Sequence, residues 1–297
     1  MFERLFAESG LSLDRLRSLL EVGATGSIAK AAAGDPVRQS QYSRQIKELE
    51  DFFQTRLVER HGKGLRLTAN GKALARISRF FMLGLSNFQR GCLDEEQRFS
   101  IGASAAFNQA FLLPVLANSH LAQSGVRHGV EIVTDDEIER RLHDLTLDFG
   151  IVTAAKISRP LQLTQLGEWR LVLCVPKALH KTECRALQAF HQRRLPLALP
   201  ARESAVANLP ALKICEPTLS CDNFLEARIA LEEQSLAAFL PDYLVPTANS
   251  NSFLRVRFPE LDSLVFHFHL AWNPRLLRLN PHAARKRDFL IKTLTRS

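Results

Sequence analysis

The residues whose types and spacing could do chemistry lie in one short segment, 34–53, which reads GDPVRQSQYSRQIKELEDFF. At 100° per residue, a helix there collects its large apolar side chains on one side. These side chains are Tyr42, Ile46, Leu49 and Phe53. The opposite side carries Ser40, Arg44 and Lys47, which donate hydrogen bonds to acceptors and to negative charge. The pattern predicts a helix that is buried on one face and contacts a polyanion with the other.

The positive charge of the chain is concentrated around this segment. Residues 1–92 hold 15 Lys and Arg against 9 Asp and Glu, whereas the remaining 205 residues hold 24 against 22. Local basicity is typical of a nucleic-acid partner, although a solvated basic surface explains the charge equally well. Gln39 and Arg44 favour the first interpretation, because glutamine and arginine can each make two hydrogen bonds to a base edge.

The neighbouring sequence supplies elements that would hold this helix in place. Ser12 can cap a first helix, Ser27 can cap a short second one, and Gly34 can end it in a left-handed turn. Helix, turn and amphipathic helix form a helix-turn-helix, whose second helix enters the DNA major groove. Residues 57–60 and 65–68 read as two short strands joined by a turn, and this hairpin predicts a wing.

A long amphipathic helix is expected after the wing. The hairpin carries Arg60, Lys63 and Arg66, which can meet phosphates, and Thr68 can cap a helix over 69–92. Apolar residues recur along it every three or four positions, at Leu74, Ile77, Phe81, Leu85 and Phe88. A long helix with one apolar stripe favours pairing with a second copy of the chain; the alternative is packing on its own domain.

Length and composition limit the class of protein. A chain of 297 residues predicts about two domains. No window approaches the roughly 18 apolar residues of a membrane span, and the opening MFERLFAESG lacks a secretory signal pattern. Five cysteines without a CxxC spacing favour a reducing compartment. We therefore expect a cytoplasmic protein without a membrane segment.

From residue 98 onward, short apolar runs alternate with helical segments, which predicts an α/β architecture with largely parallel sheets. The expected strands are 99–103, 130–134, 148–152, 170–175, 196–200, 253–258 and 264–272, and the expected helices lie near 106–122, 136–146, 222–234 and 283–295. In such folds, ligands bind beyond the carboxyl ends of strands or in a crevice between subdomains.

The motifs of residues 13–72 together resemble the winged helix-turn-helix of LysR-type transcriptional regulators. The matching residues are Ala31, Ala32, Gln39, Ser43, Arg44, Gln45, Ile46, Leu49, Glu50, Leu57, Glu59, Arg60, Leu67, Thr68 and Gly71. The resemblance implies a DNA-binding domain over 1–67, a linker and dimerisation helix over 68–92, and an effector-binding domain over 98–297. The predicted DNA-binding residues are Ser27, Arg38, Gln39, Ser40, Ser43, Arg44, Lys47, Arg60 and Lys63.

The sequence departs from the family pattern where the recognition helix begins. The family usually has Ser-Gln-Pro-Ala-Leu there, but residues 38–42 read RQSQY. Asp35 and Pro36 are a good N-cap and a good first helical residue. We therefore predict that the helix begins earlier than usual, or that the turn is reshaped, so that Arg38 adds a phosphate or guanine contact.

The later segments resemble the two-lobed effector domain of the same family, which is similar to periplasmic solute-binding proteins. The matching places are Ile101 to Ser104, Leu113-Pro114, Leu147-Asp148, Ile151 and Phe239 to Pro241. The resemblance implies one lobe of 98–172 plus 273–297, a second of 173–272, and a pocket between them. The predicted effector-binding residues are Ser104, Thr153, Pro200 and Arg202; a helix cap and a surface cation are the alternatives for Ser104 and Arg202.

Other constellations have less support. His267 and His269 share a strand face without a third ligand at metal-site spacing, and the Cys215 and Cys221 pair does not match the cysteine segment of peroxide-sensing members. The common nucleotide-binding and hydrolase motifs do not occur, so we expect no catalytic residue, cofactor or metal.

The resulting prediction is a transcriptional regulator with several partners. They are double-stranded DNA, a second copy of the chain in a homodimer or homotetramer, a small-molecule effector and, by resemblance, RNA polymerase. The alternatives are a solute-binding protein without a DNA role, which would require export, and an enzyme in the α/β region, which has only fold analogy behind it.

Overall fold

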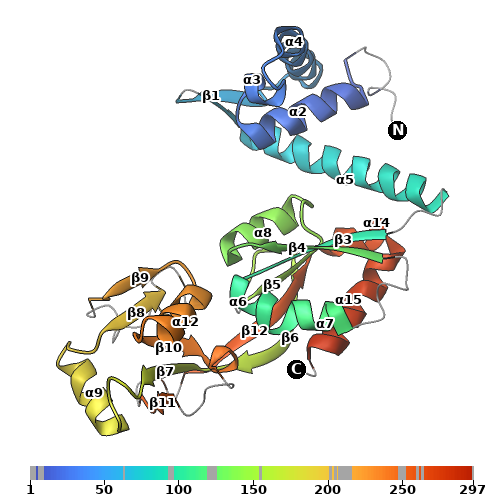
Figure 1. Cartoon of the computed structure of the whole chain (residues 1–297). Coiled ribbons are helices and arrows are strands. Elements are labelled where there is room, and N and C mark those ends of the chain that lie inside the picture. The colour runs from blue at the N-terminus through green and yellow to red at the C-terminus, as the bar shows by residue number, and fades with distance from the viewer. Residues whose placement is uncertain are drawn as a thin grey trace. The chain divides into compact units, whose positions relative to one another are not determined.

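The computed structural model describes residues 5, 10–62, 64–92, 97–118, 126–153, 156–200, 203, 206, 216–246, 252–258, 261 and 264–295. The chain forms two compact units (Figure 1), one built from the first 95 residues with two short later segments and one from the rest. Within the described residues, no helix is both long and apolar enough to cross a bilayer.

The first unit consists of helices, one hairpin and a long terminal helix. Its elements are α2 Leu13–Thr25, α3 Ile28–Ala31, α4 Pro36–Phe53, β1 Val58–His61, β2 Gly64–Leu67 and α5 Ala69–Cys92. Each predicted cap is confirmed: the hydroxyls of Ser12, Ser27 and Thr68 accept the N–H of the residue three positions later. Gly34, at φ 82°, follows α3 in the left-handed region that glycine tolerates.

The core of this unit joins α4 to α2. The predicted buried side of α4 is confirmed, because Tyr42, Ile46 and Leu49 are at most 3% exposed. Leu49 packs with residues of α2 such as Leu19, and Phe53 packs partly against the same cluster. Each large apolar side chain buried in this way contributes about 1.5–3 kcal/mol to the stability of the folded state. The opposite face of α4 is thereby held outward.

The second unit has two lobes, each built on a five-stranded sheet (Figure 1). The sheet of lobe I has the order β4-β3-β5-β12-β6, and that of lobe II the order β11-β7-β10-β8-β9. The lobe I strands are β3 Gln97–Ala103, β4 Val126–Ile132, β5 Phe149–Val152, β6 Gln162–Trp169 and β12 Phe266–Trp272. The lobe II strands are β7 Leu171–Pro176, β8 Leu197–Pro200, β9 Leu219–Cys221, β10 Ala237–Pro241 and β11 Phe253–Val256.

Helices cover both sheets. Those of lobe I are α6 Ala105–Phe107, the π-helix η1 Asn108–Leu112, α7 Leu113–Asn118, α8 Asp135–His143, α14 Pro274–Leu279 and α15 Pro281–Leu294. Those of lobe II are α9 Glu183–His191, α12 Phe224–Glu233 and the 3-10 turn η3 Asp242–Leu244. The cores are apolar: α8 packs Ile138 and Leu142 on the first sheet, and α12 packs Ala227 and Leu231 on the second.

Two expectations about the sheets are corrected. Each sheet is mixed rather than largely parallel, because β12 runs antiparallel to β5 and β6, and β7 runs antiparallel to β10 and β11. β12 also belongs to lobe I, although residues up to 272 were expected in lobe II. The sequence pattern did not locate β6, β9 and β10. β6 is partly exposed and β9 has only three residues, so neither shows a long apolar run, whereas β10 is a buried apolar run that was not assigned as a strand.

Candidate nucleic-acid interface and effector site

The outward side of α4 carries polar groups that no part of the described chain covers. We call Ser40, Ser43, Arg44 and Lys47 the recognition face; all four are exposed. The side chain of Arg44 is 80% exposed. The face offers hydroxyl, guanidinium and ammonium donors along one side of a helix whose other side is buried, which suits an extended polyanionic partner.

A hollow flanks α4 on each side, so that the recognition face stands out as a ridge. One hollow, of about 580 Å³, lies against α2 and includes Ser12 and Gln41. The other, of about 590 Å³, lies against α3 and the hairpin and includes Ile28 and Leu65. The major groove of DNA is about 12 Å wide and admits one helix, so a protruding ridge is the shape required to enter it.

An ion-pair chain links Arg44 to α2. The carboxylate of Glu48 accepts a hydrogen bond from Nε of Arg15 at 2.5 Å and another from Nε of Arg44 at 3.0 Å. The hydrogen bond from Arg15 is the main cause that lowers the pKa of Glu48, and the bond from Arg44 adds to it. Because Arg44 is exposed, its own pair is weak, and its guanidinium can exchange this carboxylate for a phosphate or base at little cost.

The start of α4 supports the prediction of an early helix and redirects Arg38. Asp35 is the N-cap, with Oδ1 accepting the N–H of Val37 at 2.9 Å, and Pro36 is the first helical residue. The Arg38 guanidinium lies over the ring of Tyr42 at 5.9 Å from its centre and donates to its hydroxyl. Two positions along a helix turn the side chain about 160° around the axis, so Arg38 points away from Ser40.

The hydroxyl of Tyr42 links α4 to α2 at this point. It donates to the carboxylate of Glu21, and this hydrogen bond is the main cause that raises the pKa of Tyr42. Arg38 therefore joins a network within the domain rather than the recognition face. Gln39, which is also on α4, is half-buried. Ser27, the N-cap of α3, is half-buried as well, and its hydroxyl oxygen accepts the N–H of Lys30.

The hairpin is connected to the recognition helix through Glu50. Its Oε1 accepts the backbone N–H of Leu57 at 2.8 Å and that of Val58 at 3.2 Å. Arg60 is exposed at the end of β1, whereas Lys63 lies outside the described residues. Arg56 is 86% exposed, with a long 3.5 Å contact to Glu50. Arg66 is paired with Glu59 at 2.7 Å and is less available to phosphates.

The boundary between the two lobes is aromatic on one side. Phe111 of η1 lies 5.0 Å from Tyr243 of η3, measured between ring centres, so rings of both lobes touch. Trp169, the last residue of β6, stacks on Phe266 and meets the edge of Tyr243. Trp169 is 2% exposed, and its indole Nε1 has no hydrogen-bond partner within the described structure.

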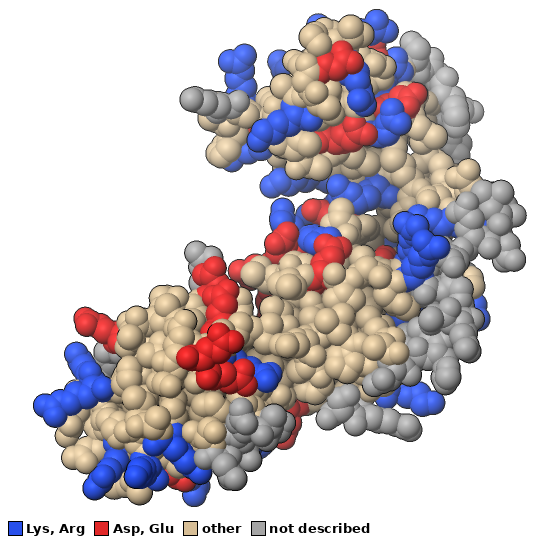
Figure 2. Space-filling view, in the orientation of Figure 1, with Lys and Arg blue, Asp and Glu red and all other residues tan. Residues whose placement is uncertain are grey.

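The same boundary is acidic. Asp135 of lobe I accepts the backbone N–H and the hydroxyl of Thr153 at 2.9 and 2.6 Å. Burial raises the pKa of Glu203 in lobe II to about 7; a hydrogen bond from the N–H of Phe224 opposes the shift and the charge of Asp135 adds to it. Figure 2 shows acidic side chains gathered over the region of α8 and α12, where Asp136 and Glu226 are exposed.

Comparisons with known proteins agree with both parts of the chain. The model of the LysR substrate binding domain matches residues 94–295, and that of the bacterial regulatory helix-turn-helix protein, lysR family, matches residues 13–72. The chain belongs to the LysR family. It is a DNA-binding transcriptional regulator of the LysR type with an effector-binding domain.

Individual relatives are distant in sequence. The transcriptional regulator HdfR of Salmonella newport (strain SL254) is 28% identical over 224 residues, which cover 72% of this chain and 80% of HdfR. A full-length OxyR variant from Pseudomonas aeruginosa superposes with a TM-score of 0.67 at 16% identity, covering 97% of this chain and 95% of that one. LysG from Corynebacterium glutamicum, solved with bound effector Arg, gives 0.58 at 16%, with coverage of 93% and 99%.

The effector residues predicted for this LysR-type chain have specific local roles. Ser104 caps α6, and its hydroxyl accepts the N–H of Phe107 at 3.3 Å. This is the helix-cap role given above as the alternative to effector binding. The hydroxyl of Thr153 donates a hydrogen bond to the carboxylate of Asp135. Pro200 is buried at the end of β8, and Arg202 lies outside the described residues. The structure thus brings Thr153 to an acidic group at the lobe boundary.

The histidine pair and Cys221 show neither a metal site nor a reactive thiol in the described part of the chain. Nδ1 of His267 contacts Gln165 at 3.0 Å, and no group of three His, Cys, Asp or Glu that could hold a metal occurs there. Burial and neighbouring acids raise the pKa of the Cys221 thiol, which is the opposite of a reactive thiolate. Cys215 lies outside the described residues.

Several residues of interest were missed from the sequence. Val37 is 76% exposed beside the recognition face, and Arg56 lines the hollow next to the hairpin. The position of Val37 right after Pro36 marks it as part of the first helical turn and could have revealed it. Glu203 and Trp169 had no such signal, because their importance depends on contacts between segments far apart in the chain.

Proposed function

We propose that the recognition face enters the DNA major groove and carries the contacts to bases. Arg44 and Lys47 supply cationic donors there, and Ser40 and Ser43 supply hydroxyls that bond to either base edges or phosphates. Val37 adds an apolar contact that fits a thymine methyl group. Arg56, Arg60 and Lys63 contact phosphates on the flank. The observation that carries this proposal is the exposed ridge of α4 between two hollows.

Two copies of the chain bind DNA together through α5. Of the stripe predicted on this helix, Leu74 packs against its own domain, whereas Ile77, Phe81, Leu85 and Phe88 are 63%, 51%, 44% and 73% exposed. Four large apolar side chains on one side of a helix favour a partner helix in water. Dimeric binding places two half-sites about one helical turn, or a multiple of it, apart on the DNA.

The effector of this domain is a cation. Asp135 and Glu203 reach the lobe boundary from different lobes, and their charges oppose each other. An ammonium or guanidinium group between them neutralises both carboxylates and gains from the aromatic ring of Tyr243. The effector Arg bound in LysG is a cation of this kind. Such a ligand favours the lobe arrangement in which both acids contact it.

The regulator acts in the cytoplasm without catalysing a reaction. Its DNA target lies in that compartment, and transcriptional control brings it into contact with RNA polymerase.

Binding to upstream DNA across a salt series tests the DNA proposal. The variant Arg44→Ala should weaken specific binding by about 1–3 kcal/mol if Arg44 reads a base, or lower the salt slope by about one unit if it contacts a phosphate. Arg90→Ala, at the far end of α5, removes the same charge and should leave both quantities unchanged. Absence of salt-dependent binding by the unmodified chain would overturn the proposal.

Calorimetry with arginine tests the effector proposal separately. Citrulline has the same shape and the same α-ammonium group but a neutral side chain, and should bind much more weakly if the guanidinium is the group held between the two carboxylates. Glu203→Gln should weaken arginine binding while leaving DNA affinity in the absence of effector unchanged. Equal binding of arginine and citrulline would reject the guanidinium as the group that the acids bind, without affecting the DNA result.

A further inference from the structure

One carboxylate lies beside the recognition face, whose charged residues are Arg44 and Lys47. Glu48 follows Arg44 by one helical turn on α4, and its side chain is 29% exposed. An acid at this position repels the phosphates of any DNA that approaches, so it lowers the affinity for DNA of every sequence. Affinity alone therefore does not explain an acid at this position.

Arg15 of α2 holds this carboxylate in place. Its Nε donates to Oε2 of Glu48 at 2.5 Å, and the Arg15 side chain is only 24% exposed. The two helices are packed together by a core in which Leu19 and Leu49 are fully buried. A carboxylate that is supported from a second helix has fewer available positions than one on a free surface side chain.

The other oxygen of Glu48 binds Arg44 through a single nitrogen. Oε1 accepts a hydrogen bond from Nε of Arg44 at 3.0 Å. Within the described part of the chain, the terminal nitrogens Nη1 and Nη2 of Arg44 make no hydrogen bond, and the side chain is 80% exposed. Arg44 therefore offers outward the donors at the end of its guanidinium plane.

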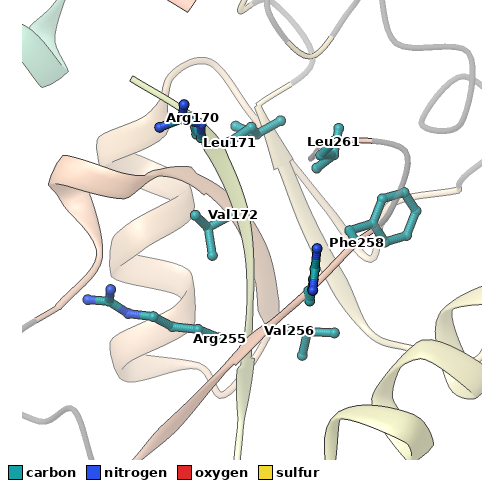
Figure 3. A pocket seen from close by; sticks show the side chains of 8 residues that line it. Arg170, Leu171, Val172, Arg255, Val256, Phe258 and Leu261 are labelled. Atoms are coloured by element: carbon teal, nitrogen blue, oxygen red, sulfur yellow. The ribbon is translucent and has the colours of Figure 1, made fainter. Parts of the chain in front are cut away.

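Two exposed arginines on lobe II provide a contrast. Arg170 and Arg255 line a hollow there (Figure 3). The contact from Arg170 to Glu168 is long, at 3.8 Å, and Arg255 has no carboxylate partner among the described residues. An exposed arginine of this chain is thus not always held by an acid, and the support of Arg44 is specific to its surroundings.

Guanine is the base whose edge matches two such donors. In the major groove it presents the acceptors O6 and N7 side by side, and one guanidinium can bond both. An unsupported arginine must first order several side-chain bonds, and it can turn to a phosphate instead. A guanidinium held at Nε has lost part of this freedom before DNA arrives. Fixing Nε therefore favours the contact to guanine.

We propose that Glu48 is a positioning residue for guanine recognition. Held by Arg15, it fixes Nε of Arg44, so that Nη1 and Nη2 bond O6 and N7 of one guanine in the half-site. This inference rests on the proposed entry of α4 into the major groove, and it specifies what Arg44 reads there. Glu48 itself makes no contact with DNA.

This arrangement gives Glu48 two opposite effects on binding. On DNA that lacks the guanine, Arg44 exchanges Glu48 for a phosphate, because an exposed ion pair is weak, and the acid then only repels the duplex. On the correct site the pair is kept, and Glu48 strengthens the contact to guanine. Removing the carboxylate should therefore raise the affinity for unrelated DNA and lower the preference for the correct site. A carboxylate that only stabilised the fold would not produce this divergence.

Duplexes with altered guanines test the proposal with the full chain. Selection from random-sequence duplexes by the unmodified chain defines the half-site. Each guanine of that site is then replaced in turn by 7-deazaguanine, which lacks N7 but keeps O6. One replacement should weaken binding of the unmodified chain by about fivefold or more, and Arg44→Ala should remove this penalty. That position is the guanine read by Arg44.

Glu48→Ala should reduce the same penalty to about twofold or less, and should tighten binding to a duplex of unrelated sequence by about two- to fivefold. Asp51→Ala is the matched control, because it removes an exposed carboxylate of α4 that has no arginine partner among the described residues. It should also tighten binding to the unrelated duplex but leave the penalty unchanged.

Two further variants separate positioning from a role in folding. Glu48→Gln keeps the size of the residue and one acceptor oxygen, so the penalty should fall there as well even if the alanine variant is unstable. In the double variant of Arg44→Ala and Glu48→Ala, loss of Glu48 should not change the penalty further, because Glu48 acts through Arg44.

The outcomes distinguish this proposal from the one on which it rests. A penalty that persists in Glu48→Ala but disappears in Arg44→Ala would overturn the role of Glu48 and leave DNA binding by α4 intact. Equal weakening on the selected and unrelated duplexes would assign Glu48 a structural role and overturn it too. If Arg44→Ala leaves the penalty at every guanine in place, Arg44 reads no guanine and the inference is wrong. If the unmodified chain binds no duplex, the DNA-binding proposal itself fails.

Discussion

The carboxylate of Glu50 on the recognition helix accepts the backbone N–H of Leu57 at 2.8 Å. This bond joins the helix to the hairpin, and the Glu50 side chain is only 11% exposed. Removing this carboxylate in Glu50→Ala leaves two half-buried N–H groups without an acceptor. We therefore expect a loss of about 1–3 kcal/mol in the free energy of unfolding. Denaturant melts of the variant and the unmodified chain measure the difference.

The companion variant Glu50→Gln retains one acceptor oxygen and should lose clearly less. If both variants unfold like the unmodified chain, Glu50 does not hold the hairpin in place.

The N-cap at Asp35 determines where the recognition helix begins. Asp35→Ala removes the acceptor for the N–H of Val37, and we expect a loss of about 0.5–2 kcal/mol. Asp35→Asn keeps an acceptor and should be nearly neutral. Urea unfolding monitored by circular dichroism measures both. Equal losses in the two variants would mean that the charge, and not the cap hydrogen bond, stabilises this turn.

The apolar stripe of α5 should hold two copies together. Phe88 is 73% exposed in the single chain, and Phe88→Asp places a charge where the partner helix would pack. We expect the variant to sediment as a monomer at concentrations at which the unmodified chain is a dimer or larger. Ser86→Asp adds the same charge on the opposite side of the helix and should leave assembly intact. A stable dimer of the Phe88 variant would rule out pairing through this stripe.

The buried carboxyl of Glu203 should make stability depend on pH. Its pKa in the folded protein is about 7, raised above the ordinary value of 4.5 by burial, so the folded state binds a proton more tightly than the unfolded state. The contribution to stability is therefore complete below about pH 4.5 and is lost as the pH rises through 7. Between pH 5.5 and 8 we expect the unmodified chain to lose about 2 kcal/mol more than Glu203→Gln. Parallel pH profiles of the two proteins would contradict this.

The first unit was largely predictable because its signals are local. A cap, a glycine turn and a 3.6-residue period act within a few residues. The bounds of α5, the early start of α4 at Pro36 after its cap Asp35, and the buried side containing Tyr42 therefore follow from neighbouring residues alone. The polar composition of the recognition face was likewise readable, since it is the complement of the buried side.

Tertiary structure decided what depends on distant partners. Arg38 has the right chemistry to contact DNA, yet it donates to the hydroxyl of Tyr42, which in turn donates to Glu21, on another side of the helix. The strand ending at Trp272 pairs with segments about a hundred or more residues earlier, which placed it in lobe I. A linear pattern specifies which side of an element is buried, but hydrogen-bonded pairing and charge proximity arise only when separated segments meet. The acidic lobe boundary exists for that reason.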